Sequence, residues 1–370
     1  MTKRQQRWFG TGAVALALAF VAYHFTRHGG WQHFNWNQFS RLLLHANPWW
    51  LAVAVVASYA SYAVRAYRWK FFLDPIRKAS LWNLFVAQIL GFSSIYLVGR
   101  IGEIVRPAYI ARKEKVSYTS QAAIWLLERV YDGLAVCILF GLALDLEPIR
   151  PKSFHAVVTL RRMHEGAFIV LAVMVAVIAA LAIFRVYSEK LIGTGSRVLR
   201  FLPEGARRLL GRLSRSFADG LDVIEDWRDL SASVGCTVLL WLINVSIFWL
   251  VFHSLGGSVA RLTWWAAALA LFFAALGLLL QLPGIGGGYE LGIILALRQV
   301  FHVPAESATG AGVMAWLVVL VPCLTLGIIL LAYEGLSFKR LGKMAEEETV
   351  ASSQLSVASP ESSRQRDSVR

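Results

Sequence analysis

The stretch VGRIGEIVRP, residues 98–107, follows directly on an apolar run that begins at residue 82. The run is shorter than the ~20 residues that a helix needs to cross a bilayer. Its two glycines and its proline favour a tight turn and restrain the segment that follows. The same stretch carries Arg100, Glu103 and Arg106. It predicts a helix that breaks within the membrane and turns back, with charged residues at the turn.

The composition of the whole chain is that of a membrane protein. Of its 370 residues, 57% are hydrophobic and 16% are charged, whereas ~25% are charged in soluble domains. The formal net charge is +14. The three cysteines lie in separate apolar stretches and lack the spacing of a zinc site. We expect no metal, no cofactor and no nucleic-acid partner.

Apolar stretches follow one another along the chain. They lie at residues 8–26, 49–66, 82–98, 120–144, 167–186, 232–253, 263–282, 286–300 and 310–334. Two of them, 82–98 and 286–300, are short, and 263–282 ends at Pro283-Gly284. Such segments are typical of re-entrant or broken helices that line a cavity. We therefore predict an all-α polytopic membrane protein with about six full transmembrane helices and two re-entrant elements.

The distribution of lysine and arginine predicts the topology. If residues 82–110 and 263–300 both return to the side from which they enter, most of these residues gather on one side. If both segments cross, the two sides carry similar numbers. The positive-inside rule favours the first arrangement. It predicts a multi-pass protein of the cytoplasmic membrane with both termini in the cytoplasm.

The same arrangement predicts an inverted repeat, a design common among transporters. A shift of 187 residues pairs Gly99 with Gly286 and Glu103 with Glu290. The predicted organisation is an integral membrane domain at 1–344 followed by a disordered cytoplasmic tail at 345–370. The membrane domain contains two repeat halves, at about 48–186 and 232–336, linked by a basic loop at 187–230.

The linking loop contains a predicted amphipathic helix. Between Leu210 and Trp227, apolar residues recur at three- and four-residue steps, with arginines at neighbouring positions. Such a helix lies either on the anionic surface of the cytoplasmic leaflet or on the base of the protein itself. The sequence leaves both interpretations open.

The two breaks supply the first group of candidate site residues. The glycines and prolines expected to form the breaks are Gly99, Gly102, Pro107, Pro283, Gly284, Gly286 and Gly287. Arg100, Glu103 and Arg106 would lie at the tip or mouth of the first break, where an arginine fork suits a phosphate. The alternative is an interfacial cluster in which Glu103 balances the arginines.

Glu290 follows the second break and would lie opposite Glu103 in the repeat. A carboxylate at this place would bind a cation, carry a proton or pair with an arginine. The alternative is a carboxylate at a helix N-terminus, favoured by the helix dipole and by free amide groups.

The stretch WLLERVYDGL, residues 125–134, places charged residues inside a predicted span. Glu128 and Asp132 are four residues apart and share a helical face, and Arg129 lies to one side. Charges in a bilayer are costly and face a partner or a wet cavity. We expect either a polar pathway or an ion pair of Arg129 with Glu103 or Asp132. Arg65, which is expected to be the deepest of the basic residues closing the preceding span, would reach the same cavity.

These motifs, in this order and spacing, resemble those of a known membrane family, the transmembrane flippase domain of lysylphosphatidylglycerol synthases. The residues that carry the resemblance are Gly99, Arg100, Gly102, Glu103, Arg106, Glu128, Arg129, Asp132, Pro283, Gly284, Gly287 and Glu290. The resemblance covers roughly residues 10–340. The chain departs from the pattern at Ile285, where a second glycine is expected. The resemblance implies a lipid-translocating domain, here without the aminoacyltransferase domain that makes the lipid in two-domain members.

The sequence shows no catalytic constellation, so we expect a non-enzyme that moves or binds an anionic lipid, either a phospholipid or an isoprenoid phosphate. Its partners would be membrane lipids, with a second copy of the chain as a further candidate. Arg100, Arg106 and Arg129 would hold phosphate, and Glu103, Asp132 and Glu290 would gate by exchanging ion pairs. The alternatives are an integral-membrane transferase for a lipid-linked substrate and a non-transporting assembly partner in a lipid pathway.

Overall fold

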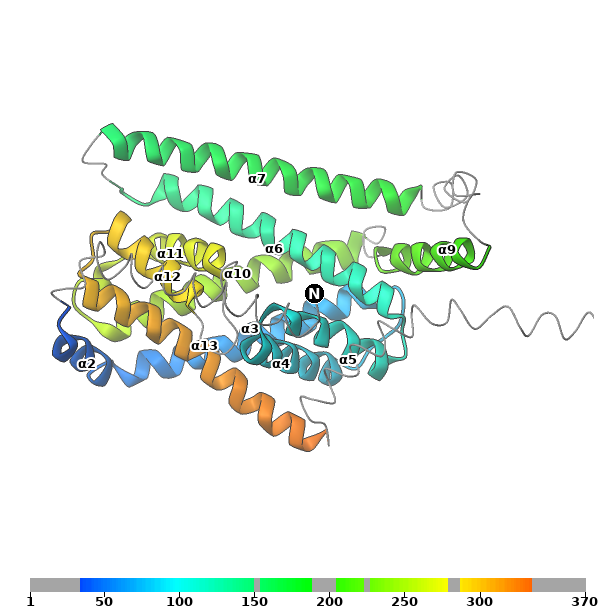
Figure 1. The fold of residues 1–370 in the computed structure, drawn as a ribbon, viewed down its shortest axis with the longest axis horizontal. Helices are drawn as coiled ribbons and strands as arrows, with labels where there is room; N and C mark the ends of the chain where they lie inside the picture. Colours follow the sequence, from blue (N-terminus) through cyan, green and yellow to red (C-terminus); the bar gives the residue numbers. More distant parts are fainter. Residues whose placement is uncertain (1–33, 150–153, 188–203, 223–226, 279–286, 335–370) are drawn as a thin grey trace, which may run out of the picture.

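The computed structural model describes residues 34–149, 154–187, 204–222, 227–278 and 287–334, where all regular structure is helical (Figure 1). The helices of the first part are α2 (Trp36–Leu44), α3 (Pro48–Leu73), α4 (Leu81–Val98), a 3-10 turn (Gly99–Ile104), α5 (Val105–Glu114), α6 (Tyr118–Leu146) and α7 (Phe154–Val186). Those of the second part are α9 (Glu204–Asp219), α10 (Trp227–Leu255), a 3-10 turn (Val259–Arg261), α11 (Trp264–Gly277), α12 (Gly288–Leu295), a π-helical turn (Ala296–Val300) and α13 (Ala305–Tyr333). The predicted span at 8–26 and the predicted tail at 345–370 lie outside the described residues.

The prediction of an all-α membrane protein is confirmed. Three described helices are long and apolar enough to cross a membrane, namely α10, α13 and the part of α7 from His164 onward. Helix α3 joins them if it is counted together with α2, from which it is bent by 72°. Helix α6 has 29 residues, but the charged residues at its centre interrupt its apolar sequence. The predicted number of six spans is therefore not established by these helices alone.

Polar side chains fix where the long helices begin. The side chain of Asn47 accepts the backbone N–H of Trp49 at 3.0 Å, and Pro48 occupies the first position of α3. Ser117 accepts the backbone N–H of Ser120 at 3.0 Å at the start of α6. These caps satisfy amide groups that have no partner within the helix. Proline suits the first turn because its missing N–H is not needed there.

Both predicted breaks are hairpins in which two helices pack against each other. The first hairpin is α4 and α5, joined through Gly99, which has φ +75°. A side chain at Gly102 would collide with the backbone of Ser94 in α4. The second hairpin is α11 and α12, where a side chain at Gly277 would collide with the carbonyl of Gly288. Only glycine permits these close approaches between the paired helices.

Each hairpin begins and ends at the same end of the helical bundle (Figure 1). Asn83, near the start of α4, donates to Glu114 at the end of α5 at 2.7 Å. At the opposite end, Thr263 before α11 hydrogen-bonds Glu147. Glu306, which follows the second hairpin, accepts the backbone N–H of Asn35 at 3.0 Å. The first hairpin thus lies toward the start of α6 and the second toward its end, and the inverted repeat stays a prediction.

Helix α9 packs on the protein rather than standing alone. Phe217 contacts Phe184 of α7 edge to face, with ring centroids 5.8 Å apart. Leu221, just after α9, is fully buried, and Gly220 lies against the carbonyl of Ser120 in α6. Of the two interpretations of the loop helix, the described residues favour packing on the base of the protein. The helix ends at Asp219, well before Trp227.

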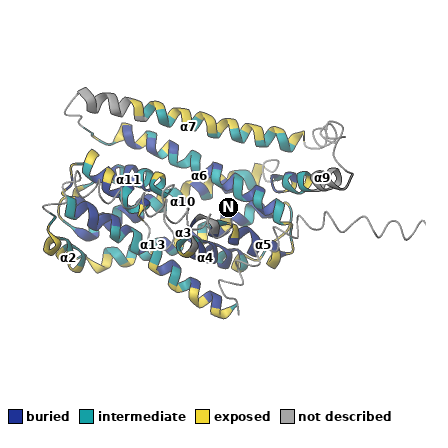
Figure 2. Ribbon diagram, in the orientation of Figure 1, coloured by how far each residue is buried: buried dark blue, intermediate teal, exposed yellow. Residues whose placement is uncertain are grey.

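Many large apolar side chains are exposed on the outside of the described helices, as on a lipid-facing surface. Figure 2 shows exposed residues along much of α7. Helix α7 is the clearest case, because its most apolar stretch is unburied and exposes Phe168, Ile169 and Ile183. Inside the bundle, apolar residues form two buried cores. One is built mainly from α10 to α13, and the other mainly from α3, α4, α5 and the first half of α6.

Candidate functional site

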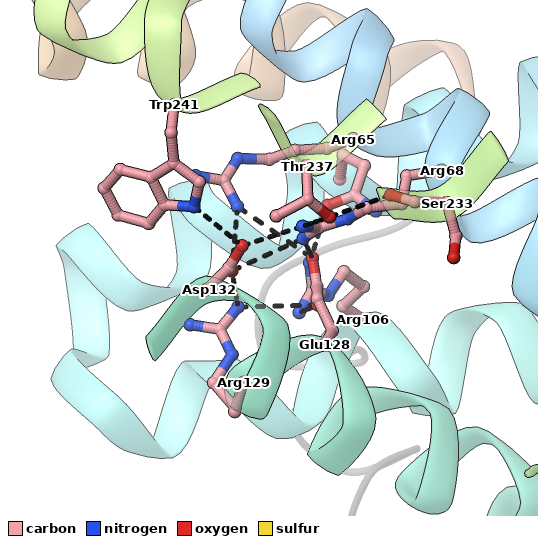
Figure 3. Close-up of polar contacts among 10 residues, drawn as sticks. Arg65, Arg68, Arg106, Glu128, Arg129, Asp132, Ser233, Thr237 and Trp241 are labelled. Atoms are coloured by element: carbon pink, nitrogen blue, oxygen red, sulfur yellow. Dashed lines mark hydrogen bonds and ion pairs between the residues drawn. The ribbon is translucent and has the colours of Figure 1, made fainter. Parts of the chain in front are cut away.

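Charged side chains from three helices meet inside the bundle (Figure 3). We call this group the charged cluster. It consists of Arg65 and Arg68 from α3, Arg106 from α5, and Glu128, Arg129 and Asp132 from α6. The predicted sharing of one face by Glu128 and Asp132 is confirmed, since both contact the guanidinium of Arg68. Charges in a membrane interior are costly unless they are paired, and the cluster provides that pairing.

Arg68 is the most deeply placed of the four arginines. Its Nη2 donates to Glu128 Oε1 at 2.6 Å and its Nη1 to Asp132 Oδ1 at 2.7 Å. Nη1 also donates to the hydroxyl of Thr237 in α10 at 3.0 Å. The side chain of Arg68 has no exposed surface, whereas that of Arg65 is 12% exposed. Arg68 is thus more buried than Arg65, while the depth of Arg65 in the membrane stays a prediction.

Arg106 is also held by protein partners. Its Nη2 donates to Glu128 Oε2 at 2.5 Å and its Nη1 to the amide oxygen of Gln88 at 2.7 Å. Its guanidinium lies 4.5 Å from the ring centroid of Trp69. We expected Arg106 at the mouth of the first break with a free fork for phosphate. The residue is instead buried, because the close packing of α5 on α4 carries its side chain inward, and Glu128 occupies the fork.

Arg65 and Arg129 differ from the other two arginines because their ion pairs are long. Arg65 Nη1 lies 3.5 Å from Asp132 Oδ2. Arg129 Nη2 lies 3.4 Å from Glu128 Oε2 and 3.8 Å from Asp132 Oδ2. The side chain of Arg129 is 37% exposed. Asp132 is thus a partner of Arg129 as predicted, and Glu128 is a second partner.

These two arginines line a cavity of about 420 Å³, which we call the large cavity. Asp132 and Glu103 line it as well. The remaining wall is mostly apolar and aromatic. Ligand sites are commonly of this size and character, with a few polar groups that fix the orientation of the ligand.

The charges around the cavity do not cancel. The charged cluster contains four guanidinium groups, and its two carboxylates together with that of Glu103 make three. The difference is an excess of one positive charge.

The turn that leads into α5 holds the other residues of the first break. Gly99 and Gly102 shape the turn as predicted, and Pro107 is buried in the first turn of α5. Glu103 reaches the large cavity from this turn. The backbone of Arg100 belongs to the same turn, but its side chain lies outside the described part of the chain.

Glu290 acts as a helix cap in this structure. Its Oε2 accepts the backbone N–H of Gly287, which has φ +101°, at 2.7 Å. Glu290 is not among the residues that line the large cavity. The geometry therefore matches the alternative interpretation, a carboxylate satisfied by amides at a helix N-terminus. Pro283, Gly284 and Gly286 of the second break lie outside the described residues.

Sequence reasoning missed three contributors to the site. Arg68 was not among the candidate residues, although it lies three residues after Arg65 and therefore on a neighbouring helical position. Thr237 and Trp241 come from α10, and Trp241 Nε1 donates to Asp132 Oδ1 at 3.2 Å (Figure 3). Their spacing of four residues places both on one face of α10. No local pattern identifies the face of α6 that they contact.

A helical bundle with apolar outer surfaces, two glycine-packed hairpins and a charge-lined internal cavity defines an integral membrane protein. The sequence model of the family described as "Lysylphosphatidylglycerol synthase TM region" matches residues 8–327. The chain belongs to this family, and the resemblance drawn from the motifs is confirmed. The family connects the protein with lipid metabolism. A comparison with curated proteins found no match.

Proposed function

We propose that the protein binds the phosphate of an anionic lipid in the large cavity and moves that lipid between the leaflets of the cytoplasmic membrane. The observation that carries the proposal is the contrast within the charged cluster. Arg68 and Arg106 make short hydrogen bonds to protein carboxylates, whereas Arg65 and Arg129 make long ion pairs at the cavity wall. The guanidinium groups of Arg65 and Arg129 can therefore still donate hydrogen bonds to a ligand.

Charge balance supports an anionic ligand. The excess of one positive charge around the cavity matches the single negative charge of a phosphodiester. Charge-assisted hydrogen bonds from arginine to phosphate are short and directional. A phosphate would replace the long contacts of Arg65 and Arg129 by shorter ones. Asp132 would keep Arg68 and Trp241 as partners, so it would not be left unpaired.

The cavity also addresses the main energetic obstacle to lipid exchange. A charged head group that crosses hydrocarbon alone loses its hydration without compensation. Arg65 and Arg129 would compensate for the lost hydration inside the bundle.

The proposal also includes an orientation in the membrane. The ends of α5 and α13 are joined by the ion pair of Lys113 with Glu334 at 2.5 Å. In this proposal both ends face the cytoplasm, together with both termini. Labelling of cysteines introduced next to Lys113 from either side of the membrane tests that orientation.

The decisive test is leaflet exchange of fluorescent lipids in proteoliposomes. The wild type should exchange an anionic phospholipid or isoprenoid phosphate. Arg129→Gln should lower the rate about tenfold or more, because a charge-assisted hydrogen bond contributes ~1.5–3 kcal/mol. The matched control is Arg162→Gln, since Arg162 is exposed on α7. Exchange that survives Arg129→Gln would contradict the proposed site.

The same preparation separates transport from the alternatives. We propose transport and not catalysis. Turnover of a lipid-linked sugar in the presence of a divalent metal would instead support a membrane transferase. Folded protein with neither exchange nor turnover would support a partner in the assembly of a lipid pathway.

A further inference from the structure

A second, smaller chamber adjoins the large cavity. It has a volume of about 140 Å³, and we call it the small chamber. The two spaces share part of their walls, which includes Arg65, Phe92, Tyr96, Trp241 and Tyr289. Arg65 therefore stands at the junction, so a ligand held by Arg65 in the large cavity can extend into the small chamber.

The polar groups of the small chamber are mostly neutral. Six uncharged side chains with hydroxyl or amide groups contribute to its lining. They are Ser58, Ser61, Tyr62, Tyr96, Asn244 and Tyr289. The large cavity, in contrast, is lined by Glu103 and Asp132. Among the described residues that line the small chamber, Arg65 is the charged one and none carries a carboxylate.

The two serines are arranged to accept hydrogen bonds. Ser58 donates its hydroxyl hydrogen to the carbonyl of Ala54 at 2.9 Å, and Ser61 donates to the carbonyl of Ser58 at 2.7 Å. A hydroxyl has one hydrogen and two acceptor positions. Both serine oxygens therefore retain acceptor capacity, which suits a ligand that carries hydroxyl groups. Asn244 can both donate and accept.

The surroundings disfavour an ammonium group. Aromatic rings can bind a cation over their faces, but the guanidinium of Arg65 already lies 5.1 Å from the ring centroid of Phe92. That of Arg106 lies 5.9 Å from the same centroid. An ethanolamine or choline group placed here would compete with these guanidinium groups for the ring of Phe92, and no carboxylate is among the described residues that line the chamber. A neutral group with several hydroxyls does not depend on that ring.

We infer that the ligand is a phosphodiester whose terminal group is a neutral polyol, such as glycerol, inositol or a sugar, and that the polyol occupies the small chamber. This inference rests on the proposed function, because it places the phosphate at Arg65 and Arg129. The polyol donates to Ser58 and Ser61 and exchanges hydrogen bonds with Asn244. The source is either a glycerophospholipid or an isoprenoid phosphodiester, since both offer the same chemistry.

The test measures lipid binding by the purified full-length protein through its ligand-dependent thermal unfolding. The probes are short-chain phosphatidylglycerol, phosphatidylinositol, phosphatidylethanolamine and phosphatidylmethanol, which is a phosphodiester without a polyol. An isoprenyl phosphate sugar and the matching isoprenyl methyl phosphate form the second series. At least one polyol lipid should bind about tenfold more tightly than the methyl lipid of its series, the gain from one or two hydrogen bonds. The series that shows the gain identifies the source.

The variant Asn244→Leu should remove most of that tenfold preference and leave the Kd of the methyl phosphodiester unchanged. The matched control is Asn37→Leu, since Asn37 is exposed on α2. Equal binding of polyol and methyl lipids, or tighter binding of phosphatidylethanolamine, would overturn the inference and leave the proposed function standing. An equal loss of affinity for the polyol lipid and the methyl lipid in Asn244→Leu would likewise overturn the inference and leave the proposed function standing. Absence of binding by every phosphodiester would overturn both proposals.

Discussion

Arg68 Nη1 lies 2.7 Å from Asp132 Oδ1, and this contact joins α3 to α6 in the buried interior of the bundle. The same guanidinium reaches Glu128, so one arginine bridges two carboxylates of α6. Short contacts of this kind distinguish Arg68 from the two arginines of the charged cluster that line the large cavity. Arg68 maintains the structure, whereas Arg65 and Arg129 face the cavity.

Arg68→Met should destabilise the protein by about 3–5 kcal/mol, because it removes a close charged partner from two buried carboxylates. The measurement is thermal or denaturant unfolding of the protein in detergent. Arg112→Met is the control, since Arg112 is exposed on α5. Equal stability of the two variants would show that Arg68 does not hold the helices together.

Arg65→Gln should affect the ligand more than the fold. Its ion pairs with Asp132 and Glu128 are 3.5 Å and 3.9 Å long, so we expect a stability loss of about 1 kcal/mol, close to that of an exposed pair. Binding of an anionic lipid should weaken about tenfold, as for the loss of one charge-assisted hydrogen bond. Parallel measurements of unfolding and of lipid binding check that the variant loses more binding than stability. A variant that unfolds as easily as Arg68→Met would contradict it.

Gly102→Ala should destabilise the first hairpin by about 1–3 kcal/mol, the usual effect of overpacking. The new methyl group would meet the backbone of Ser94 and Ile95, which cannot move without displacing α4. Gly141→Ala in α6 is the control, because nothing lies within 4 Å of the added carbon. That change should stabilise α6 by up to ~1 kcal/mol through helix propensity. A loss of stability in both variants, or in neither, would argue against close packing of the hairpin.

Glu290→Gln should retain lipid exchange, because a glutamine oxygen can still accept the N–H of Gly287. Glu290→Ala should cost about 1 kcal/mol of stability through loss of the cap. The assays are leaflet exchange for the first variant and unfolding for the second. If Glu290→Gln abolished exchange in a folded protein, the charge of Glu290 would be needed for more than capping.

Local signals were sufficient to predict the breaks in the chain. Gly99 and Gly102 determine backbone geometry through their own lack of a side chain, so their role is visible in the sequence. The same holds for Glu128 and Asp132, whose spacing of four residues puts both on one helical face. These features depend only on residues close together in the chain.

The roles of individual arginines could not be predicted in this way. Whether an arginine faces a carboxylate or a cavity depends on helices distant in sequence. Arg106 lies close to a predicted turn, yet the packing of α5 carries it to Glu128 in α6. Trp241 reaches Asp132 from α10, more than 100 residues away in sequence. The sequence supplied the candidate residues, and the fold determined which of them remain available to a ligand.

The pairing of α3 with α6 constrains how the protein is made. Helix α3 emerges from the ribosome first and carries Arg65 and Arg68, while their carboxylate partners follow on α6. Neither helix is suited to lipid by itself, because each would expose unpaired charge. Helix α7 has no such restriction, since its outer stretch is apolar throughout. We therefore expect α3 and α6 to enter the bilayer together, after α6 has been synthesised, so that their charged side chains pair with one another.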